Sequence, residues 1–322
     1  MRRNAVLAFA LVAVCSNGAT LNRPTASAAS SPTPGSPSAP TLLAPCGVTP
    51  APPQAWGHVI WIWMENTSYV QIVGSAEAPY INSLIEQCGL ATNYHNITHP
   101  SLPNYIAATS GLGYAQLVPF GSDCSPSLLC STTARSIFDQ TGWKAYQESM
   151  PSNCLDHNSG QYVVRHNPPP YYRRLAGCAT YDVPIGRLQA DLQANTLPSF
   201  SFVTPNVCHD MHDCSISNGD TWLSQLIPAI LESPGYQEGS TAVFLTWDEG
   251  AGSFPPTCAG NTTSESCHVV TVVISPTTTA GTEAGPLFNH WSLLRTTEEM
   301  LGIGEFLGHA AESTSMRSPF NL

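Results

Sequence analysis

Short continuous apolar runs alternate along this chain with segments in which apolar residues recur at helical spacing. The runs predict buried strands at residues 58–64, 90–96, 143–150, 199–206, 241–247 and 268–275. The helical spacing predicts helices at residues 78–89, 101–111, 133–142, 185–195, 220–233 and 290–301, of which the first two end at a glycine. Residues 151–182 are rich in loop-forming residues and predict no regular element.

Strands that alternate with helices predict an α/β fold, in which a mostly parallel central sheet is covered by helices on both faces. In such a fold, ligands bind beyond the carboxyl ends of the strands. Three expected strands run into polar clusters, at residues 65–66, 206–213 and 248–249. The helix that begins near Ser101 would bring its N-terminus to the same edge. We therefore expect these four segments to form one site.

Two of these clusters carry oxygen ligands of the kind that divalent cations prefer. Glu65 and Asn66 pair a carboxylate with an amide oxygen, and Asp248 and Glu249 are adjacent carboxylates after a strongly apolar strand. The adjacent acids repel each other unless a cation lies between them. The alternatives are an Asx turn or a glycosylation sequon at Asn66, and a solvated turn at Asp248.

The segment CHDMHDC places two histidines and two aspartates between two cysteines. Its spacing is too tight for all four Cys and His side chains to bind one zinc ion tetrahedrally. We expect instead a loop closed by a disulfide, which presents His209 and His212 to a metal ion, a phosphate or a leaving group.

Ser101 lies between two prolines at the expected start of a helix, in the sequence THPSLPNY. The common role of a serine at this position is a helix N-cap, and proline is well tolerated in a first turn. A helix N-terminus also attracts phosphate, and a cation beside the hydroxyl would stabilise the alkoxide that attacks phosphorus. Together with the oxygen ligands and the histidine loop, this position favours phosphate-ester hydrolysis through a phosphoserine intermediate.

The remaining candidates carry weaker signals. His99, two residues before Ser101, is a possible substrate contact, whereas His95 and His290 have no assigned role and His268 is expected to be structural. Arg173 and Arg174 could meet an anion, but a surface loop is the simpler interpretation of the sequence NPPPYYRR.

The N-terminus predicts export. Two arginines, a short apolar run and small residues up to Ala28 are typical of a secretory signal peptide, whereas a twin-arginine signal and a lipoprotein cysteine at Cys15 fit poorly. No later segment is apolar enough to span a membrane. The formal charge of −11 becomes about −14 once the three arginines of residues 1–28 are removed. A chain so poor in basic residues is not expected to bind nucleic acid, and its oligomeric state stays open.

Residues 29–55 are rich in Pro, Ser and Thr and predict an extended linker, and residues 56–322 predict a single domain. The ten cysteines after Cys15 are an even number, as disulfides in an exported protein require. Neighbouring cysteines could close three short loops, and two more distant pairs would remain: Cys124–Cys130, Cys208–Cys214 and Cys258–Cys267, then Cys46–Cys88 and Cys154–Cys178.

Five segments resemble, in this order, a bacterial phosphoesterase family that includes secreted acid phosphatases and phospholipases C: WMENTSY, HPSLPNYIAATSG, TPNVCHDMHDCSISNGDTWL, LTWDEG and NHWSLLRTTEEMLG. The resemblance covers roughly residues 57–303 and implies a fold like that of the alkaline phosphatase superfamily. It also implies a divalent metal ion, with Ca²⁺, Mg²⁺, Mn²⁺ and Zn²⁺ all open, held by Glu65, Asn66, Ser101, Asp248 and Glu249.

The same resemblance implies roles in catalysis. Ser101 matches the family's Ser or Thr nucleophile, ahead of a Pro-Asn pair kept here as Pro103 and Asn104. The loop that contacts phosphate and assists the leaving group is matched by His209, His212 and Asp213. Substrate contacts are expected from Asn66, Asn104 and His99. The chain departs from the phospholipase members, since it is short, has Ser where many of them have Thr, and has no clear counterpart there for its His99.

These features predict a secreted, metal-dependent phosphoesterase that hydrolyses phosphate monoesters as acid phosphatases do. Its substrate would be a small phosphate ester or a phospholipid headgroup. The close alternative is a phospholipase C-type phosphodiesterase, and an alternative of another class is a non-catalytic secreted protein that binds a phosphate-bearing ligand. A sulfatase-like function is disfavoured, because SLPNY has Asn104 where the sulfatase pattern CxPxR requires arginine.

Overall fold

The computed structural model describes residues 44–322, so the expected signal peptide and residues 29–43 of the expected linker lie outside the described residues. The strands are β1 (His58–Met64), β2 (Gly89–Ala91), β3 (Tyr94–His95), β4 (Trp143–Gln147), β5 (Asp182–Pro184), β6 (Phe200–Thr204), β7 (Thr241–Trp247), β8 (Thr271–Ile274), β9 (Thr282–Ala284) and β10 (Phe288–Asn289). The α-helices are α1 (Tyr69–Ile72), α2 (Pro79–Gln87), α3 (Ser101–Ser110), α4 (Tyr114–Leu117), α5 (Cys178–Tyr181), α6 (Gly186–Gln193), α7 (Ile216–Leu231), α8 (Pro234–Gln237), α9 (His290–Met300) and α10 (Arg317–Phe320). Within this part of the chain, no helix has the length and apolar character that a membrane crossing requires.

The large sheet has eight strands in the order β5-β4-β6-β1-β7-β8-β2-β9. Neighbouring strands pair in parallel except at β8, which runs antiparallel to both β7 and β2. β10 and β3 form a separate two-stranded parallel ladder. This arrangement confirms the predicted α/β fold with a mostly parallel central sheet.

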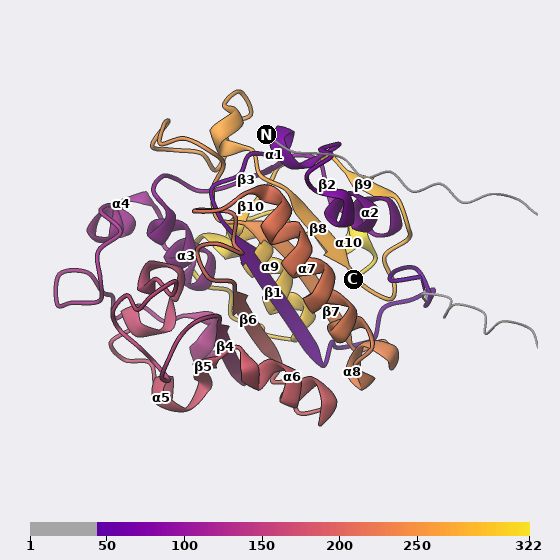
Figure 1. The fold of residues 1–322 in the computed structure, drawn as a ribbon, viewed down its shortest axis with the longest axis horizontal. Coiled ribbons are helices and arrows are strands. Elements are labelled where there is room, and N and C mark those ends of the chain that lie inside the picture. Colours follow the sequence, from indigo (N-terminus) through magenta and orange to yellow (C-terminus); the bar gives the residue numbers. More distant parts are fainter. Residues whose placement is uncertain (1–43) are drawn as a thin grey trace, which may run out of the picture. The chain divides into compact units, whose positions relative to one another are not determined.

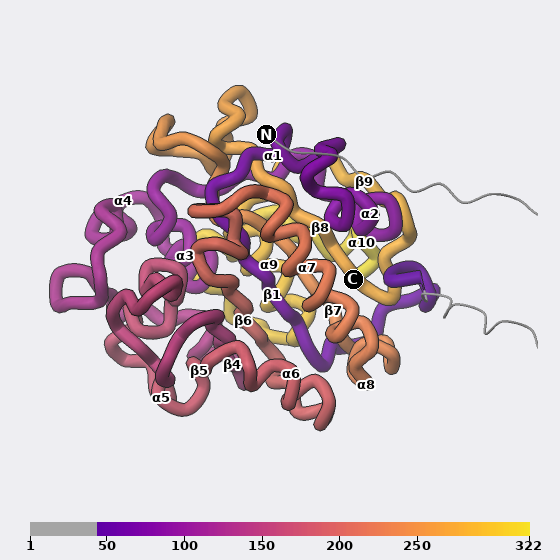
Figure 2. Tube along the Cα trace, in the orientation of Figure 1, coloured from indigo at the N-terminus to yellow at the C-terminus, as the bar shows by residue number. Residues whose placement is uncertain are grey.

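Helices cover both faces of the large sheet (Figure 1). α7 lies in front of the sheet in this view and contacts α2 and α6, whereas α9 lies behind the sheet and contacts α3. The tube in Figure 2 makes clear that α3, in purple, and α9, in yellow, are neighbours although they come from distant parts of the sequence.

β1 is apolar and buried from its second residue onward, because both faces of the sheet are covered there. Side chains alternate between the two faces along a strand, so Trp61 and Trp63 point the same way. The indole N–H of Trp61 donates to Thr297 of α9 at 2.9 Å, and the ring of Trp63 packs on Tyr105 of α3 with 5.0 Å between centroids. These contacts attach α3 and α9 to the centre of the sheet.

The register of the central strands brings their carboxyl ends to one edge. Met64 of β1 pairs with Trp247 of β7, so both strands end at the same level. β6 lies on the other side of β1, with Val203 opposite Ile62. The residues that follow these three parallel strands therefore emerge side by side at this edge.

Residues 44–55, the part of the expected linker that the structure describes, are attached to the domain. Cys46 is buried and forms a disulfide with Cys88. The backbone N–H of Thr49 donates to Pro276 O at 2.8 Å, and the Tyr236 hydroxyl donates to Pro45 O. The domain therefore begins before residue 56, because a disulfide and hydrogen bonds hold this segment in place.

All five expected disulfides form: Cys46–Cys88, Cys124–Cys130, Cys154–Cys178, Cys208–Cys214 and Cys258–Cys267. The secondary structure differs from the prediction at several places. Segment 151–182, for which no regular element was predicted, contains α5 and the first residue of β5. The expected helix at 133–142 is only a 3-10 turn at Ile137–Asp139, since a run this short cannot cover the cost of nucleating an α-helix. The expected strand at 90–96 splits at a turn into β2 and β3, which join different sheets.

Candidate active site

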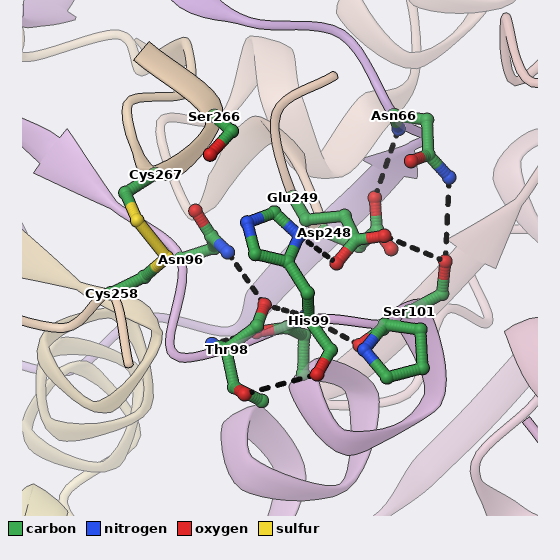
Figure 3. Close-up of polar contacts among 12 residues, drawn as sticks. Asn66, Asn96, Thr98, His99, Ser101, Asp248, Glu249, Cys258, Ser266 and Cys267 are labelled. Carbon is green, nitrogen blue, oxygen red and sulfur yellow. Dashed lines mark hydrogen bonds and ion pairs between the residues drawn. A yellow bond between two sulfur atoms is a disulfide. The ribbon is translucent and has the colours of Figure 1, made fainter. Parts of the chain in front are cut away.

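The ends of β1 and β7 bring three predicted ligands together, of which Asn66 and Asp248 are labelled in Figure 3. The backbone N–H of Asn66 donates to Asp248 Oδ1 at 3.1 Å, and the amide of its side chain donates to Glu65 Oε2 at 3.0 Å. Glu65 and Asp248 have no measurable exposure. The turn at Asn66, whose φ is 46°, directs its side chain back toward these carboxylates. The predicted clustering of Glu65, Asn66 and Asp248 is therefore observed.

Ser101 joins this cluster from the first turn of α3. Its hydroxyl donates to Glu65 Oε2 at 3.0 Å and lies 3.5 Å from Glu249 Oε1. The amide of Asn66 approaches the same Oγ at 3.4 Å (Figure 3). Ser101 does not cap the helix, because Pro100 occupies the N-cap position and Ser101 is already helical. The interpretation of Ser101 as a simple N-cap is therefore wrong.

His99 supports Glu249 rather than facing Ser101. Its Nδ1 lies 2.7 Å from Glu249 Oε2, and its ring is buried. The disulfide between Cys258 and Cys267 lies on the other side of the ring, with both sulfur atoms within 4.8 Å of a ring nitrogen (Figure 3). The predicted contact between His99 and the substrate does not agree with this orientation, since the ring is enclosed by Glu249 and the disulfide.

The three acids Glu65, Asp248 and Glu249 are buried at close quarters. Burial raises the pKa of each carboxyl well above its ordinary value, and repulsion raises it further, from Asp248 on Glu65, from Glu249 on Asp248 and from Glu65 on Glu249. Among the described residues, no Lys or Arg forms an ion pair with any of the three. Asp248 Oδ2 is buried without a hydrogen-bond partner. This donor set of hard oxygen atoms fits a divalent cation, which would supply the missing positive charge.

Two side chains that the sequence analysis did not identify contact Glu65 Oε1, the oxygen that does not bind Ser101. The Tyr105 hydroxyl, on α3, donates to Glu65 Oε1 at 2.5 Å. His166 Nε2 lies 3.1 Å from the same oxygen, and its Nδ1 lies 3.1 Å from Asp210 Oδ2. Tyr105 sits in the predicted helix but carries no sequence signal for this role. His166 lies in the loop-rich segment 151–182, where only the residue type itself could have drawn attention.

The loop closed by Cys208–Cys214 reaches the site through Asp210 and His212. The ring of His212 lies 6.0 Å from that of His166, its Nδ1 is 2.7 Å from Asp213 Oδ1, and its Nε2 is 3.4 Å from an Arg165 nitrogen. His209 is turned elsewhere, with Nδ1 at 2.9 Å from Glu148 Oε2 and its ring stacked on Trp222. The structure thus places His212 beside His166 and Arg165, leaves Asp213 exposed with its side chain on His212, and orients His209 away from the site.

Asn104 is fully buried, and both ends of its amide bind backbone. Its Oδ1 accepts from the N–H groups of Ile97 and Thr98, and its Nδ2 donates to Thr98 O and Pro100 O. The amide therefore fixes the turn ahead of Ser101. It has no free group for a substrate, so the predicted substrate contact of Asn104 is corrected to a role in shaping this turn.

The N-terminus of α3 is completed by Asp123, which the sequence analysis also missed. Its Oδ1 accepts from the Leu102 N–H at 2.9 Å, and its backbone has a φ of 51°. Burial raises the pKa of this carboxyl, and the Arg165 guanidinium opposes the shift. Asp123 thus performs the capping function that the sequence had suggested for Ser101.

The other histidines have structural contacts. His290 Nε2 lies 2.6 Å from Asp248 O and its Nδ1 lies 3.1 Å from the Tyr94 hydroxyl, so this ring supports the turn after β7. His268 stacks between Tyr69 and His95, as expected for a structural residue. Arg173 is exposed, as is Arg174 beside it, in agreement with a surface loop.

Comparison with solved structures gives the class of fold. A protein of the alkaline phosphatase superfamily from Vibrio parahaemolyticus superimposes with a TM-score of 0.53 at 14% sequence identity. The superposition covers 88% of this chain and 76% of that one. At this identity the likeness concerns the fold alone, and it agrees with the fold that the sequence motifs implied.

Sequence comparison gives the family. The sequence model of the Phosphoesterase family matches residues 74–304, and this chain therefore belongs to the Phosphoesterase family. A phosphate-repressible acid phosphatase of Penicillium chrysogenum is 30% identical over 210 residues, which are 61% of this chain and 48% of the relative. A phosphatidylinositol-3-phosphatase of Mycobacterium tuberculosis is 29% identical over 202 residues, which are 62% of this chain and 65% of the relative. The chain thus spans about half to two thirds of the length of these relatives.

Proposed function

We propose that this chain is a metal-dependent phosphoesterase that hydrolyses phosphate monoesters through a phosphoserine intermediate on Ser101. The observation that carries this proposal is the position of the Ser101 hydroxyl, 3.0 Å from Glu65 Oε2 and 3.5 Å from Glu249 Oε1 at the first turn of a buried helix. A serine with no other task than capping would bind the N–H groups of its own helix, which Ser101 does not. The acid phosphatase relative supports the choice of a monoester.

The proposed cation ligands are Glu65, Asn66, Ser101, Asp248 and Glu249. A divalent cation bound there would lower the pKa of the Ser101 hydroxyl and offset charge on the phosphoryl group. The ligands are all oxygen donors in this set, which favours Ca²⁺, Mg²⁺ or Mn²⁺ over softer ions.

The chain's own residues account for the proton transfers. As Ser101 Oγ attacks phosphorus, the Oγ–P bond forms while the bond from phosphorus to the leaving oxygen breaks. Glu65 Oε2 is the nearest acceptor for the Oγ proton, at 3.0 Å. His212, at the rim beside Arg165, is the candidate that protonates the leaving oxygen. In the second step a water molecule gives a proton to His212 and attacks phosphorus, the Oγ–P bond breaks, and Glu65 returns its proton to Ser101 Oγ as inorganic phosphate leaves.

The Cys208–Cys214 loop and the disulfide beside His99 support a further part of the proposal, namely that the protein works outside the cytoplasm. Five disulfides in the described residues fit an oxidising compartment. Together with the sequence of residues 1–28, they support a secreted enzyme.

The test is hydrolysis of p-nitrophenyl phosphate by wild type, Ser101→Ala and Ser110→Ala. Ser110 is the matched control, because it is buried in the same helix and its hydroxyl contacts backbone groups, donating to Ile106 O and accepting from the Leu112 N–H. We expect Ser101→Ala to lose at least about 10³-fold in kcat and Ser110→Ala to keep the wild-type rate. Acid quenching during turnover should trap phosphate on Ser101, which mass spectrometry detects.

Three outcomes would change the proposal. Full activity of Ser101→Ala would exclude the serine nucleophile. Faster hydrolysis of p-nitrophenylphosphorylcholine than of p-nitrophenyl phosphate would identify a phosphodiesterase of the phospholipase C type. Binding of phosphate esters without hydrolysis in the presence of Ca²⁺, Mg²⁺, Mn²⁺ or Zn²⁺ would indicate a non-catalytic binding protein.

A further inference from the structure

We propose that His166 is a positioning residue, which orients the cation-binding carboxylate of Glu65 and fixes the Cys208–Cys214 loop against it through Asp210. The inference rests on the proposed function only in requiring that Glu65 binds a cation. It assigns a role to a histidine that the proposed chemistry leaves unused, and it explains why a carboxylate of the loop points inward instead of toward solvent.

The two oxygens of Glu65 have separate partners. Oε1 receives the Tyr105 hydroxyl at 2.5 Å and faces His166 Nε2 at 3.1 Å. Oε2 receives the Ser101 hydroxyl and the Asn66 amide, each at 3.0 Å. Oε1 is therefore the oxygen by which the protein holds the carboxylate, and Oε2 is the oxygen turned toward the proposed cation.

The ring of His166 is itself held firmly. It stacks on the ring of Tyr105 with 5.5 Å between centroids and 6° between planes, and 2% of its side chain is exposed. Its other nitrogen, Nδ1, lies 3.1 Å from Asp210 Oδ2. The stack on Tyr105 and the Nδ1 contact with Asp210 fix the ring in one orientation. In that orientation Nε2 lies 3.1 Å from Glu65 Oε1, a close contact without hydrogen-bond geometry, which restricts where the carboxylate of Glu65 can lie.

Asp210 connects the Cys208–Cys214 loop to the end of β1. The backbone N–H of Glu65 donates to Asp210 O at 2.8 Å, while Asp210 Oδ1 accepts from the His212 N–H at 2.8 Å. The loop is thus joined to the end of β1 twice, once by backbone and once through His166. A change in the position of Asp210 must therefore move both Glu65 and the backbone of His212.

A purely structural role for His166 would predict a different outcome. Filling the space between Tyr105 and the loop would stabilise the metal-free and metal-bound proteins equally. A positioning role affects the affinity for the cation, because the free energy of binding depends on where Glu65 Oε2 is held. The measurement must therefore compare cation binding, and not only stability or activity, between variants.

Two substitutions separate the contacts of the ring. In His166→Asn the amide can take the place of Nδ1 beside Asp210 but is too short to reach Glu65. In His166→Gln the amide can take the place of Nε2 beside Glu65 but loses Asp210. Asp182→Asn is the matched control, because Asp182 is equally buried and binds Asn167, the residue next to His166, without touching the site.

The protein is freed of metal by chelation and titrated calorimetrically with Ca²⁺, Mg²⁺, Mn²⁺ and Zn²⁺. The cation that wild type binds most tightly is then titrated into each variant. We expect His166→Asn to weaken binding about 10- to 100-fold and to shrink the cation-induced rise in Tm. His166→Gln should lose less, and Asp182→Asn should bind as wild type does. Circular dichroism of the metal-free proteins verifies that each variant folds. If a His166 variant does not fold, Asp210→Asn takes its place, because asparagine keeps the shape of the carboxyl group. Asp210→Asn should also bind the cation more weakly than wild type.

Wild-type affinity in His166→Asn, His166→Gln and Asp210→Asn would overturn the inference while the proposed function stands. If wild type binds none of the four cations, the metal site of the proposed function fails first, and this inference fails with it. A loss of affinity in Asp182→Asn equal to that in His166→Asn would also overturn it, because the effect would then come from general loosening of the segment.

Discussion

Arg165 is the basic side chain whose charge acts on most carboxyls of the site. Its guanidinium lowers the pKa of Glu65, Glu249, Asp210 and Asp123, in each case against a larger rise caused by burial. It is half-buried, and its terminal nitrogen lies 3.4 Å from His212 Nε2. With the proposed divalent cation, the three carboxylates would carry a net charge of about −1, so a dianionic phosphate ester would need a further positive charge at the rim.

We therefore predict that Arg165→Gln raises the KM for p-nitrophenyl phosphate about tenfold and weakens competitive inhibition by inorganic phosphate to a similar degree. Steady-state kinetics with and without phosphate measure both quantities. Arg173→Gln, on the exposed loop, should change neither. An unaltered inhibition constant for phosphate in Arg165→Gln would show that this cation does not meet the phosphoryl group.

Asp182 is a buried acid outside the site whose titration should affect stability. Burial raises the pKa of its carboxyl to about 8, although the Asn167 amide donates to it at 2.8 Å. The unfolded chain releases this proton near the ordinary value of 3.8, whereas the folded protein retains it up to about 8. The folded state thus binds more protons between these values, and its stability must fall as the pH rises through this range.

We predict that this group alone lowers the free energy of unfolding by about 1.4 kcal/mol per pH unit between pH 5 and 7. Urea unfolding at several pH values measures the slope. Asp182→Asn should flatten it and should be more stable than wild type at pH 8. Identical slopes in the two proteins would mean that Asp182 is already ionised in the folded state.

At the scale of elements, α3 is fixed at both ends, which keeps Ser101 in place. Asp123 binds its first turn, and Gly111 ends it with a φ of 70°. A Cβ on Gly111 would lie 2.1 Å from Leu307 O, because the backbones of the two segments touch there. The same contact carries a hydrogen bond from the His309 N–H to Gly111 O at 2.8 Å. The C-terminal segment after α9 thus supports the helix that carries the proposed nucleophile.

Gly111→Ala is expected to destabilise the protein by at least about 2 kcal/mol, because it adds a left-handed alanine and a steric clash with backbone. Gly142→Ala is the control, since a Cβ there meets nothing within 4 Å. Chemical unfolding compares the two variants with wild type. Equal stability of the two alanine variants would contradict the close approach at residue 307.

The apolar pattern predicted the elements that form the site because strand ends are local features. The run that ends at Met64 and the run that ends at Trp247 locate Glu65 and Asp248 without any knowledge of pairing. His166 and Asp123 were missed for the opposite reason. His166 ends a short 3-10 turn and Asp123 lies in an irregular segment. Their partners Glu65 and Leu102 are reached only through tertiary packing. The role of Asn104 was misjudged because sequence does not reveal which amide is fully buried.

At the scale of the whole molecule, five disulfides constrain the unfolded chain to different degrees. Cys46–Cys88 spans 42 residues and ties the N-terminal segment to the end of α2, whereas Cys208–Cys214 spans six. The reduced entropy of the unfolded chain corresponds to a stabilisation of about 4 kcal/mol by the first disulfide and about 2 kcal/mol by the second. The long disulfide thus contributes to stability, and the short one mainly limits the shapes of the loop that carries Asp210 and His212.

We predict that replacing Cys46 and Cys88 together by serine lowers the free energy of unfolding more than replacing Cys208 and Cys214. The second pair of substitutions should instead reduce hydrolysis of p-nitrophenyl phosphate more strongly. Urea unfolding compares the stability of the two double variants, and kinetics compare their rates of hydrolysis. If the Cys208/Cys214 variant were the less stable one, or the Cys46/Cys88 variant the less active one, this division of roles between the two disulfides would be contradicted.

The order of the strands has a consequence for biogenesis. Asn66 and Asp248 touch although 182 residues separate them, because β7 enters the sheet beside β1 only late in the chain. A nascent polypeptide would therefore carry the proposed ligands Glu65, Asn66 and Ser101 long before Asp248 and Glu249 are available. Cation binding should therefore begin only once the central sheet is complete. The ions present in the compartment where folding ends, and not where synthesis begins, would then decide which ion the protein acquires.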